Sequence, residues 1–221
     1  VNQGFCPLCY SFRIEFLVSK NVYKHKRDFI FCLNCELIFV PTRFHLSEQQ
    51  QIDRYMQHNN NPDDKKYRKF LSKIIEPLMD NIAPGSKGLD YGSGPGPTLS
   101  LMLEELGYSV KIFDKYFSPD KLVLLSDYDF ITCTETAEHF VNPRNEFDKF
   151  YKILKDDGIL AIMTSMFDSK NNFENWYYNR DPTHVSFYTR NTMIWIANIY
   201  YYEIIFYSSS IVLFKKKINI N

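Results

Sequence analysis

The sequence predicts an α/β protein built on a doubly wound, mostly parallel sheet, with a small cysteine-containing unit before it. Two observations lead to this fold class. An apolar strand ending at Tyr91 runs into a glycine-rich turn and then into a helix, and further apolar strands alternate with helical patterns after it. Four of the five cysteines lie within the first 35 residues, in two C-x-x-C pairs.

The glycine-rich turn is the most informative segment. Gly92, Gly94 and Gly96 occupy alternate positions, and Pro97 suits the first turn of the following helix. A strand, a bare turn and a helix N-terminus bring backbone N–H groups close to a ligand. A dinucleotide fold needs G-x-G-x-x-G, whose third glycine falls where this chain has Pro97. The pattern here is instead D-x-G-x-G-x-G, with Asp90 as its acidic residue.

The segments that follow continue the same alternation. A strand over 109–113 ends at Asp114, about twenty residues after the glycines, where a carboxylate can accept both hydroxyls of a ribose. Another strand, over 128–133, precedes the string E-x-x-E-H at 135–139. A further strand over 158–164 follows an Asp-Asp-Gly turn.

In order and spacing these segments resemble the class I S-adenosylmethionine (SAM) methyltransferases of the type 11/23 group, over roughly residues 80 to 214. The resemblance implies a Rossmann-like, seven-stranded-type sheet that ends in an antiparallel hairpin over 202–207 and 211–215. It also implies SAM as cofactor, with Asp90 orienting the methionine amino group and Asp114 holding the ribose. The cofactor-binding residues expected on this basis are Asp90, Tyr91, Gly92, Ser93, Gly94, Gly96, Asp114, Lys115, Cys133, Thr134 and Glu135.

One segment departs from the family pattern. Between Asp114 and Tyr128 the family fits a helix, a strand and an acidic residue that receives the adenine amino group. The 115–127 segment is too short for both elements, so this edge of the sheet is expected to be trimmed. The adenine contact is therefore open, with Lys115 and Tyr116 as candidates beside the ribose carboxylate.

The paired cysteines predict a zinc ribbon. Cys6, Cys9, Cys32 and Cys35 form two knuckles about twenty residues apart, and the residues between them have the composition of a β-hairpin. Two disulfides or idle thiols are the alternative, which a reducing compartment disfavours. A ribbon this small depends on its metal for folding. We therefore expect a ribbon over 1–42, cofactor-flanking helices over 43–83 and a methyltransferase domain over 84–221.

Composition restricts the classes of partner. The 221 residues carry a formal net charge of zero, which gives no support to non-specific nucleic-acid binding. No run approaches the ~18 apolar residues that a membrane helix needs, and no signal peptide opens the chain. The expectation is a cytoplasmic protein that binds no membrane; its oligomeric state is not predicted.

Two histidines are candidate catalytic bases. His139 follows the carboxyl end of a strand, where open α/β sheets bind ligands. His184 lies in an aromatic loop that resembles the family's D-P-x-H segment; a structural bond to Asp181 is the alternative role. Glu135, Glu138 and His139 could also converge on a divalent cation, as in the ubiquinone-pathway O-methyltransferases that the E-x-x-E-H string resembles, or Glu138 and His139 could only shape the loop.

The predicted function is methyl transfer from SAM to an oxygen or nitrogen of a small hydroxylated or phenolic metabolite. A zinc-ribbon RNA methyltransferase is the main alternative, since the ribbon has a slight basic excess that includes Arg27 and Arg43. A non-catalytic SAM-binding or partner-docking module is the alternative of a different class.

Overall fold

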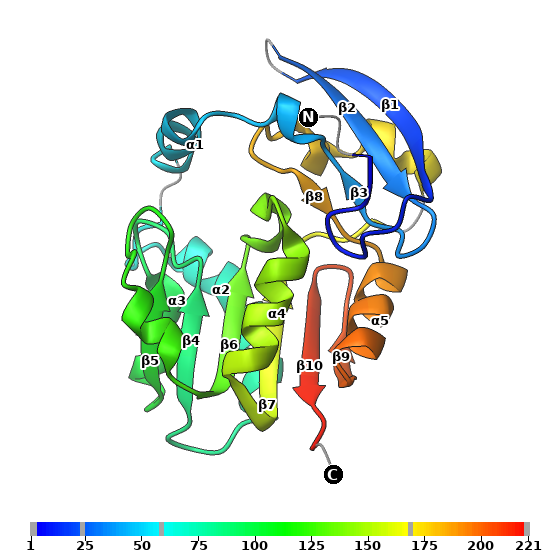
Figure 1. Cartoon of the computed structure of the whole chain (residues 1–221). Coiled ribbons are helices and arrows are strands. Elements are labelled where there is room, and N and C mark those ends of the chain that lie inside the picture. The colour runs from blue at the N-terminus through cyan, green and yellow to red at the C-terminus, as the bar shows by residue number, and fades with distance from the viewer. Residues whose placement is uncertain (1–3, 23–24, 58–59, 168–169, 219–221) are drawn as a thin grey trace.

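The computed structural model describes residues 4–22, 25–57, 60–167 and 170–218. These residues form two sheets, a six-stranded one in the lower half of Figure 1 and a four-stranded one above it. Helix α1 (Glu48–Tyr55) stands beside the space between them.

The six-stranded sheet has the order β5-β4-β6-β7-β10-β9. Strands β5, β4, β6 and β7 are parallel, while β10 is antiparallel to both β7 and β9. The predicted doubly wound sheet with a C-terminal antiparallel hairpin is thereby confirmed. The strands are β4 (Lys87–Tyr91), β5 (Ser109–Phe113), β6 (Tyr128–Thr134), β7 (Leu154–Met163), β9 (Tyr202–Tyr207) and β10 (Ile211–Lys216).

The trimmed edge lies beyond β5. After Asp114 the chain makes a single bridge with Ser118 and a short 3-10 helix, η2 (Lys121–Leu125), before it enters β6. Within the described residues no strand pairs with the outer side of β5, so the sheet has six strands where the family type has seven. The shortness of 115–127 is the physical reason.

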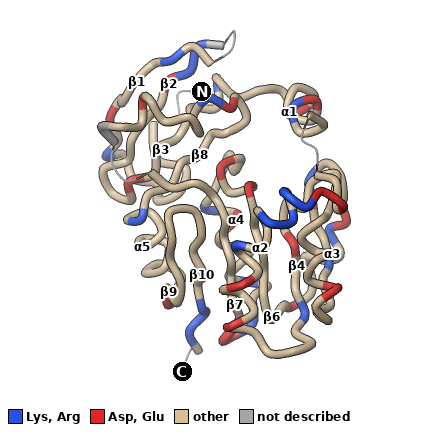
Figure 2. The backbone as a smooth tube through the Cα atoms, turned by 180° about the vertical axis from the view of Figure 1, so that it is seen from behind, with Lys and Arg blue, Asp and Glu red and all other residues tan. Residues whose placement is uncertain are grey.

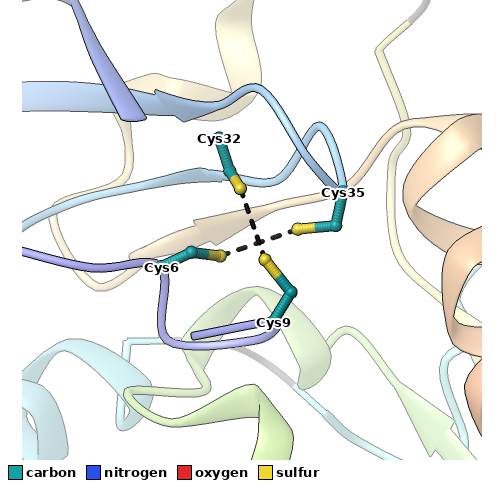
Figure 3. Close-up of side chains that lie close together, drawn as sticks. All are labelled: Cys6, Cys9, Cys32 and Cys35. Carbon is teal, nitrogen blue, oxygen red and sulfur yellow. Dashed lines mark hydrogen bonds between the residues drawn. The ribbon is translucent and has the colours of Figure 1, made fainter. Parts of the chain in front are cut away.

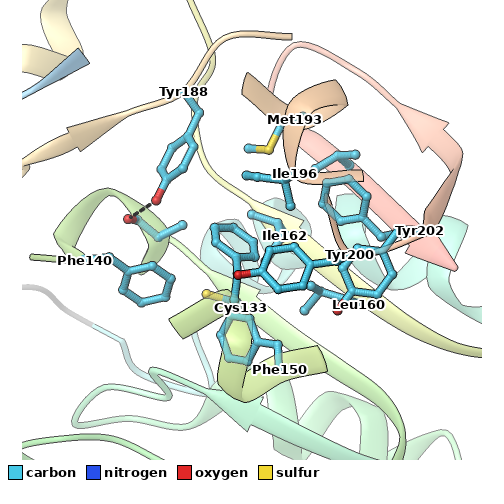
Figure 4. Close-up of a cluster of buried hydrophobic side chains, with 14 of the residues drawn as sticks. Cys133, Phe140, Phe150, Leu160, Ile162, Tyr188, Met193, Ile196, Tyr200 and Tyr202 are labelled. Carbon is cyan, nitrogen blue, oxygen red and sulfur yellow. Dashed lines mark hydrogen bonds between the residues drawn. The ribbon is translucent and has the colours of Figure 1, made fainter. Parts of the chain in front are cut away.

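Helices cover both faces of this sheet. Helices α2 (Lys65–Met79) and α3 (Thr98–Glu105) pack on one face, and α4 (Pro143–Ile153) and α5 (Arg190–Ile199) on the other. Because side chains alternate along a strand, successive β7 residues enter different clusters: Ile159 packs with α2 and α3, and Leu160 with α4 and α5. Figure 4 shows the second cluster, in which Cys133 and Phe150 lie side by side with Leu160 and Ile162.

The smaller sheet joins the N-terminal segment to a distant part of the chain. Its order is β1-β2-β3-β8, all antiparallel. The first three strands come from the predicted ribbon, and the fourth comes from the loop that follows β7. The strands are β1 (Ile14–Val22), β2 (His25–Cys32), β3 (Ile38–Phe39) and β8 (Ser186–Phe187).

Short 3-10 helices complete the fold. They are η1 (Thr42–Phe44), η3 (Ala137–His139), η4 (Lys170–Asn175) and η5 (Tyr177–Arg180). Among the described residues, no helix combines the length and apolar character needed to cross a bilayer.

We predict that Phe150→Ala lowers the unfolding free energy by about 3–5 kcal/mol. Phe150 is fully buried, with its ring centroid 4.9 Å from that of Tyr91 and 5.9 Å from that of Phe147, so truncation leaves a cavity between α4 and the sheet. Urea denaturation measures the change. Leu122→Ala, at a side chain 72% exposed, serves as control and should stay within about 0.5 kcal/mol; equal effects of both substitutions would contradict this packing.

Candidate active site

A cavity of about 590 Å³ opens at the carboxyl ends of β4, β5 and β6. This is the edge where parallel α/β sheets bind ligands. Helix α1 and the first part of α2 contribute the wall opposite the strand ends. The lining residues most relevant to chemistry are Tyr55, Tyr91, Gly92, Ser93, Gly94, Asp114, Lys115, Tyr116, Thr134, Glu135, Glu138, His139 and His184.

The glycine turn is packed against protein atoms as well as open to the cavity. A β-carbon on Gly92 would lie 2.3 Å from the Thr136 side chain, and one on Gly96 would lie 2.4 Å from the Asn60 carbonyl oxygen. Gly92 also has φ 82°, a left-handed conformation that glycine adopts without strain. Glycine is therefore needed at these positions so that the turn can pack closely against Asn60 and Thr136. The sequence alone did not indicate this requirement for glycine.

Asp114 is fixed at the end of β5 by backbone donors. Its carboxylate accepts hydrogen bonds from the N–H groups of Gly94 (3.0 Å), Tyr116 (2.8 Å) and Phe117 (3.0 Å). Each carboxylate oxygen can accept more than one bond, so the group retains acceptor capacity toward the cavity. Next to it, Lys115 Nζ lies 2.7 Å from Glu48 Oε1, which ties helix α1 to this end of the cavity.

Two hydroxyls in the cavity wall have no partner. Ser93 Oγ and Thr134 Oγ1 are buried and make no hydrogen bond to any residue that the structure describes, although both residues line the cavity. Buried polar atoms are almost always hydrogen-bonded, so an unpaired pair of hydroxyls indicates a site for a polar ligand. This observation comes from the structure alone.

Three residues expected to bind the cofactor lie outside the cavity wall. Asp90 is buried beneath the turn, where burial raises its pKa to about 7 although it accepts a 2.9 Å hydrogen bond from Thr132. Cys133 is fully buried in the hydrophobic cluster between the sheet and helices α4 and α5, so it is a core residue. Gly96 contacts Asn60 and does not line the cavity.

Two histidines and a glutamate gather at the other end of the cavity. His139 Nδ1 lies 3.0 Å from the Thr183 carbonyl oxygen, and His184 Nδ1 lies 2.8 Å from the Tyr178 carbonyl oxygen. The two imidazole centroids are 4.9 Å apart. With Glu138 they form a group whose potential ligand atoms all lie within 4.8 Å of one another. The two predicted catalytic histidines are therefore neighbours.

Burial shifts the pKa values of two side chains at this end of the cavity, Glu135 and His184. Burial and the charge of Glu138 raise the pKa of Glu135 to about 8. Burial, together with the neighbouring His139, lowers the pKa of His184 to about 4, so this imidazole is neutral at pH 7. Glu135 has φ 48°, which marks local backbone strain for a residue with a β-carbon.

Two arginines hold the loop that carries His184. Arg27, in β2 and only 1% exposed, donates to the carbonyl oxygens of Asp181 (2.8 Å) and His184. Arg54, at the end of α1, donates to Asp181 Oδ2 from Nε (3.0 Å) and from Nη2 (2.7 Å). Neither role could be predicted from sequence patterns, because each arginine joins segments more than 120 residues apart.

The four cysteine side chains point toward a common centre, as Figure 3 shows. Their sulfurs lie within 4.8 Å of one another, and none forms a disulfide. The two knuckles have equivalent backbones: Tyr10 N–H donates to the Cys6 carbonyl oxygen (3.0 Å), and Glu36 N–H donates to that of Cys32 (2.9 Å). Such a cluster fits one tetrahedral metal ion.

Comparisons with known proteins agree with this geometry. Residues 64–205 match a family described as a methyltransferase domain, which is more than half of the chain, and the protein therefore belongs to this methyltransferase family. A comparison with curated proteins finds no match.

Solved structures show the same fold at low identity. One is a 1,6-didemethyltoxoflavin N1-methyltransferase from Burkholderia thailandensis with bound S-adenosylhomocysteine, at TM-score 0.53 and 11% identity, covering 84% of this chain and 98% of that one. Another is the PH0226 protein of Pyrococcus horikoshii, at TM-score 0.53 and 13% identity, covering 75% and 99%.

We predict that Arg27→Met loosens the loop at 176–188. The substitution keeps most of the side-chain volume but leaves the His184 carbonyl without its Arg27 donor, at a cost of about 1–3 kcal/mol. The Asp181 carbonyl also loses its bond from Arg27 and keeps only the 3.2 Å bond from His184 N–H. Hydrogen exchange of this loop should accelerate by about tenfold or more. Lys26→Met, at an exposed neighbour, should leave the exchange unchanged. Equal protection in both variants would show that Arg27 does not hold the loop.

Proposed function

We propose that this methyltransferase takes its methyl group from SAM and transfers it to an oxygen or nitrogen atom of a small molecule. The observation that carries the proposal is the single cavity that joins Asp114 and two unpaired hydroxyls at one end to two imidazoles at the other. A nucleoside with a polar tail matches the first end. The related Burkholderia enzyme, which has S-adenosylhomocysteine bound, supports this choice.

The residues at the first end fit the cofactor. Asp114 would accept the ribose hydroxyls, and Lys115 and Tyr116 would border the adenine. The unpaired hydroxyls of Ser93 and Thr134 would bind the methionine end. Asp90, from beneath the turn, would orient the methionine ammonium group. When bound, SAM supplies an electrophilic methyl group on a sulfonium.

The residues at the second end fit a methyl acceptor that must lose a proton. Each histidine uses Nδ1 for a backbone carbonyl, which leaves Nε2 with a lone pair that can accept a hydrogen bond. His139 and His184 would hold the acceptor's hydroxyl or amine, and one of them would receive its proton. Tyr55, whose ring centroid is 5.1 Å from that of His139, would border the acceptor.

We propose that the four cysteines bind a structural zinc ion. Their arrangement supports zinc over disulfides, because the sulfurs face a common centre and each knuckle has the same closed turn. Cys6, Cys32 and Cys35 belong to the same hydrophobic cluster as the buried residues of α4 and α5. The cysteine-containing unit is therefore part of the main core.

An RNA acceptor has less support than a small molecule. The basic excess of the ribbon depended partly on Arg27, which is buried, and on Arg43, which pairs with Asp28 at 3.1 Å. In Figure 2, lysines and arginines are interspersed with acidic residues over the described chain. The non-catalytic alternative does not account for the paired imidazoles inside the cavity.

Isothermal titration calorimetry with SAM and S-adenosylhomocysteine tests the cofactor. Incubation with methyl-labelled SAM and either fractionated metabolites or RNA then tests the transfer. Label in a small-molecule fraction is the expected result. Label in RNA would establish the alternative acceptor, and binding without transfer would favour a non-catalytic module. The absence of heat with either compound would refute the proposal.

We predict that Asp114→Asn weakens S-adenosylhomocysteine binding by about ten- to hundredfold, since a hydrogen bond to a charged group contributes roughly 1.5–3 kcal/mol. Asparagine keeps one oxygen, which can accept from the N–H groups of Tyr116 and Phe117, so the turn after β5 should persist. Its amide nitrogen cannot accept from Gly94 N–H, so the measured loss includes that bond as well as the ribose contact. Calorimetry measures the affinity, and Asp127→Asn, at an exposed carboxylate just before the start of β6, is the control. The same affinity in both variants would remove Asp114 from the binding site.

A further inference from the structure

We propose that Glu138, His139 and His184 bind a divalent transition-metal ion at the acceptor end of the cavity. The inference rests on the proposed function, since it concerns the same cavity. The three potential ligand atoms lie within 4.8 Å of one another. Three ligand atoms at about 2.0–2.2 Å from one ion lie roughly 3–3.6 Å apart, so side-chain movements of up to about an ångström bring the group to binding geometry.

The tautomer of each histidine is fixed in favour of metal binding. A carbonyl oxygen can only accept a hydrogen bond, so Nδ1 of His139 carries its proton toward Thr183, and Nδ1 of His184 carries its proton toward Tyr178. Nε2 of each ring is left with an available lone pair. In the metal-bound protein these lone pairs would coordinate the ion, so the ion would lower the pKa of the bound acceptor, its proton would pass to solvent, and neither imidazole would act as the base. Metal-binding histidines commonly have this arrangement, in which the second nitrogen donates to a carbonyl.

Hydrogen bonds also hold the carboxylate of Glu138 in place. It is 1% exposed and accepts hydrogen bonds from two hydroxyls, Thr164 Oγ1 at 2.8 Å and Tyr178 Oη. Among the described residues, no lysine or arginine forms an ion pair with Glu138. A buried carboxylate is stable when a cation compensates its charge, and a metal ion here would do so.

This group differs from the one that the sequence predicted. Glu135 lies outside it, although Tyr178 Oη contacts its carboxylate (3.4 Å) as well as that of Glu138, while His184 joins from a loop 45 residues later. The exchange of a carboxylate for an imidazole changes which metal ions the ligand set prefers. Two imidazole nitrogens and one carboxylate oxygen favour zinc, cobalt or iron(II) over magnesium and calcium, which prefer oxygen ligands.

Three protein ligands also define the class of acceptor. A set of two histidines and one carboxylate leaves coordination positions open, and these would face the cavity that the three residues line. The acceptor would therefore be a molecule with an oxygen that binds the ion directly. This narrows the proposed substrates to those with a hydroxyl or carbonyl oxygen near the methylated atom.

Cobalt(II) titration of the full-length protein, loaded beforehand with a single equivalent of zinc, tests the site by visible absorption. Zinc retained by the cysteines leaves Glu138, His139 and His184 to take up cobalt. The expected result is one equivalent of bound Co²⁺ without the intense charge-transfer absorption of cobalt–thiolate bonds. His184→Ala and Glu138→Gln should weaken this binding at least tenfold. Tyr178→Phe, which removes one hydroxyl from Glu138 and retains the ring, should weaken it about tenfold or more.

Glu146→Gln is the matched control, because this carboxylate lines the same cavity but pairs with Lys149 and lies outside the ligand set; it should retain the cobalt affinity. No uptake of cobalt, uptake with thiolate absorption only, or equal affinity in wild type and His184→Ala would overturn the proposal. Calorimetry with S-adenosylhomocysteine on the same sample distinguishes a failure of the metal-site proposal from a failure of the proposed function. Cofactor binding without cobalt binding rejects the metal site alone, and the absence of both rejects the proposed function as well.

Discussion

The buried guanidinium of Arg27 joins the two parts of this protein. It extends from the cysteine-containing sheet and donates to two carbonyls of the loop that carries His184. Pairing of β3 with β8 and a bond from Val40 N–H to the Val185 carbonyl oxygen (2.9 Å) fix the same loop. The acceptor end of the cavity is therefore built partly on the N-terminal sheet, so the metal proposed for the cysteines would stabilise catalytic geometry at a distance.

The cofactor end depends on a different constraint. There the strand ends, the glycine turn and Asp114 form one hydrogen-bonded unit within the parallel sheet, and Asn60 and Thr136 press against the turn where β-carbons would not fit. Helix α1 connects the two ends, because Glu48 at its start pairs with Lys115 and Arg54 at its end pairs with Asp181. A movement of α1 would change both ends of the cavity together.

Local patterns were sufficient to predict alternating strands and helices and the cysteine cluster, because apolar periodicity, glycine spacing and the two C-x-x-C pairs depend on residues close in sequence. The resemblance to the methyltransferase family added the C-terminal hairpin, and the shortness of 115–127 relative to that family added the trimmed edge. The position of Cys133 in the core, by contrast, depends on which way the end of β6 faces. A one-residue offset on a strand exchanges the two faces, which the motif alone did not fix.

The amino-acid sequence by itself determined the class of fold, the cofactor-type turn and the residues available for chemistry, because these follow from short-range periodicity and motif spacing. Only the tertiary structure decided which residues meet. His139 and His184 become neighbours and Arg27 becomes a buried support through contacts between distant segments. Those contacts arise from packing two sheets together, which no local pattern encodes.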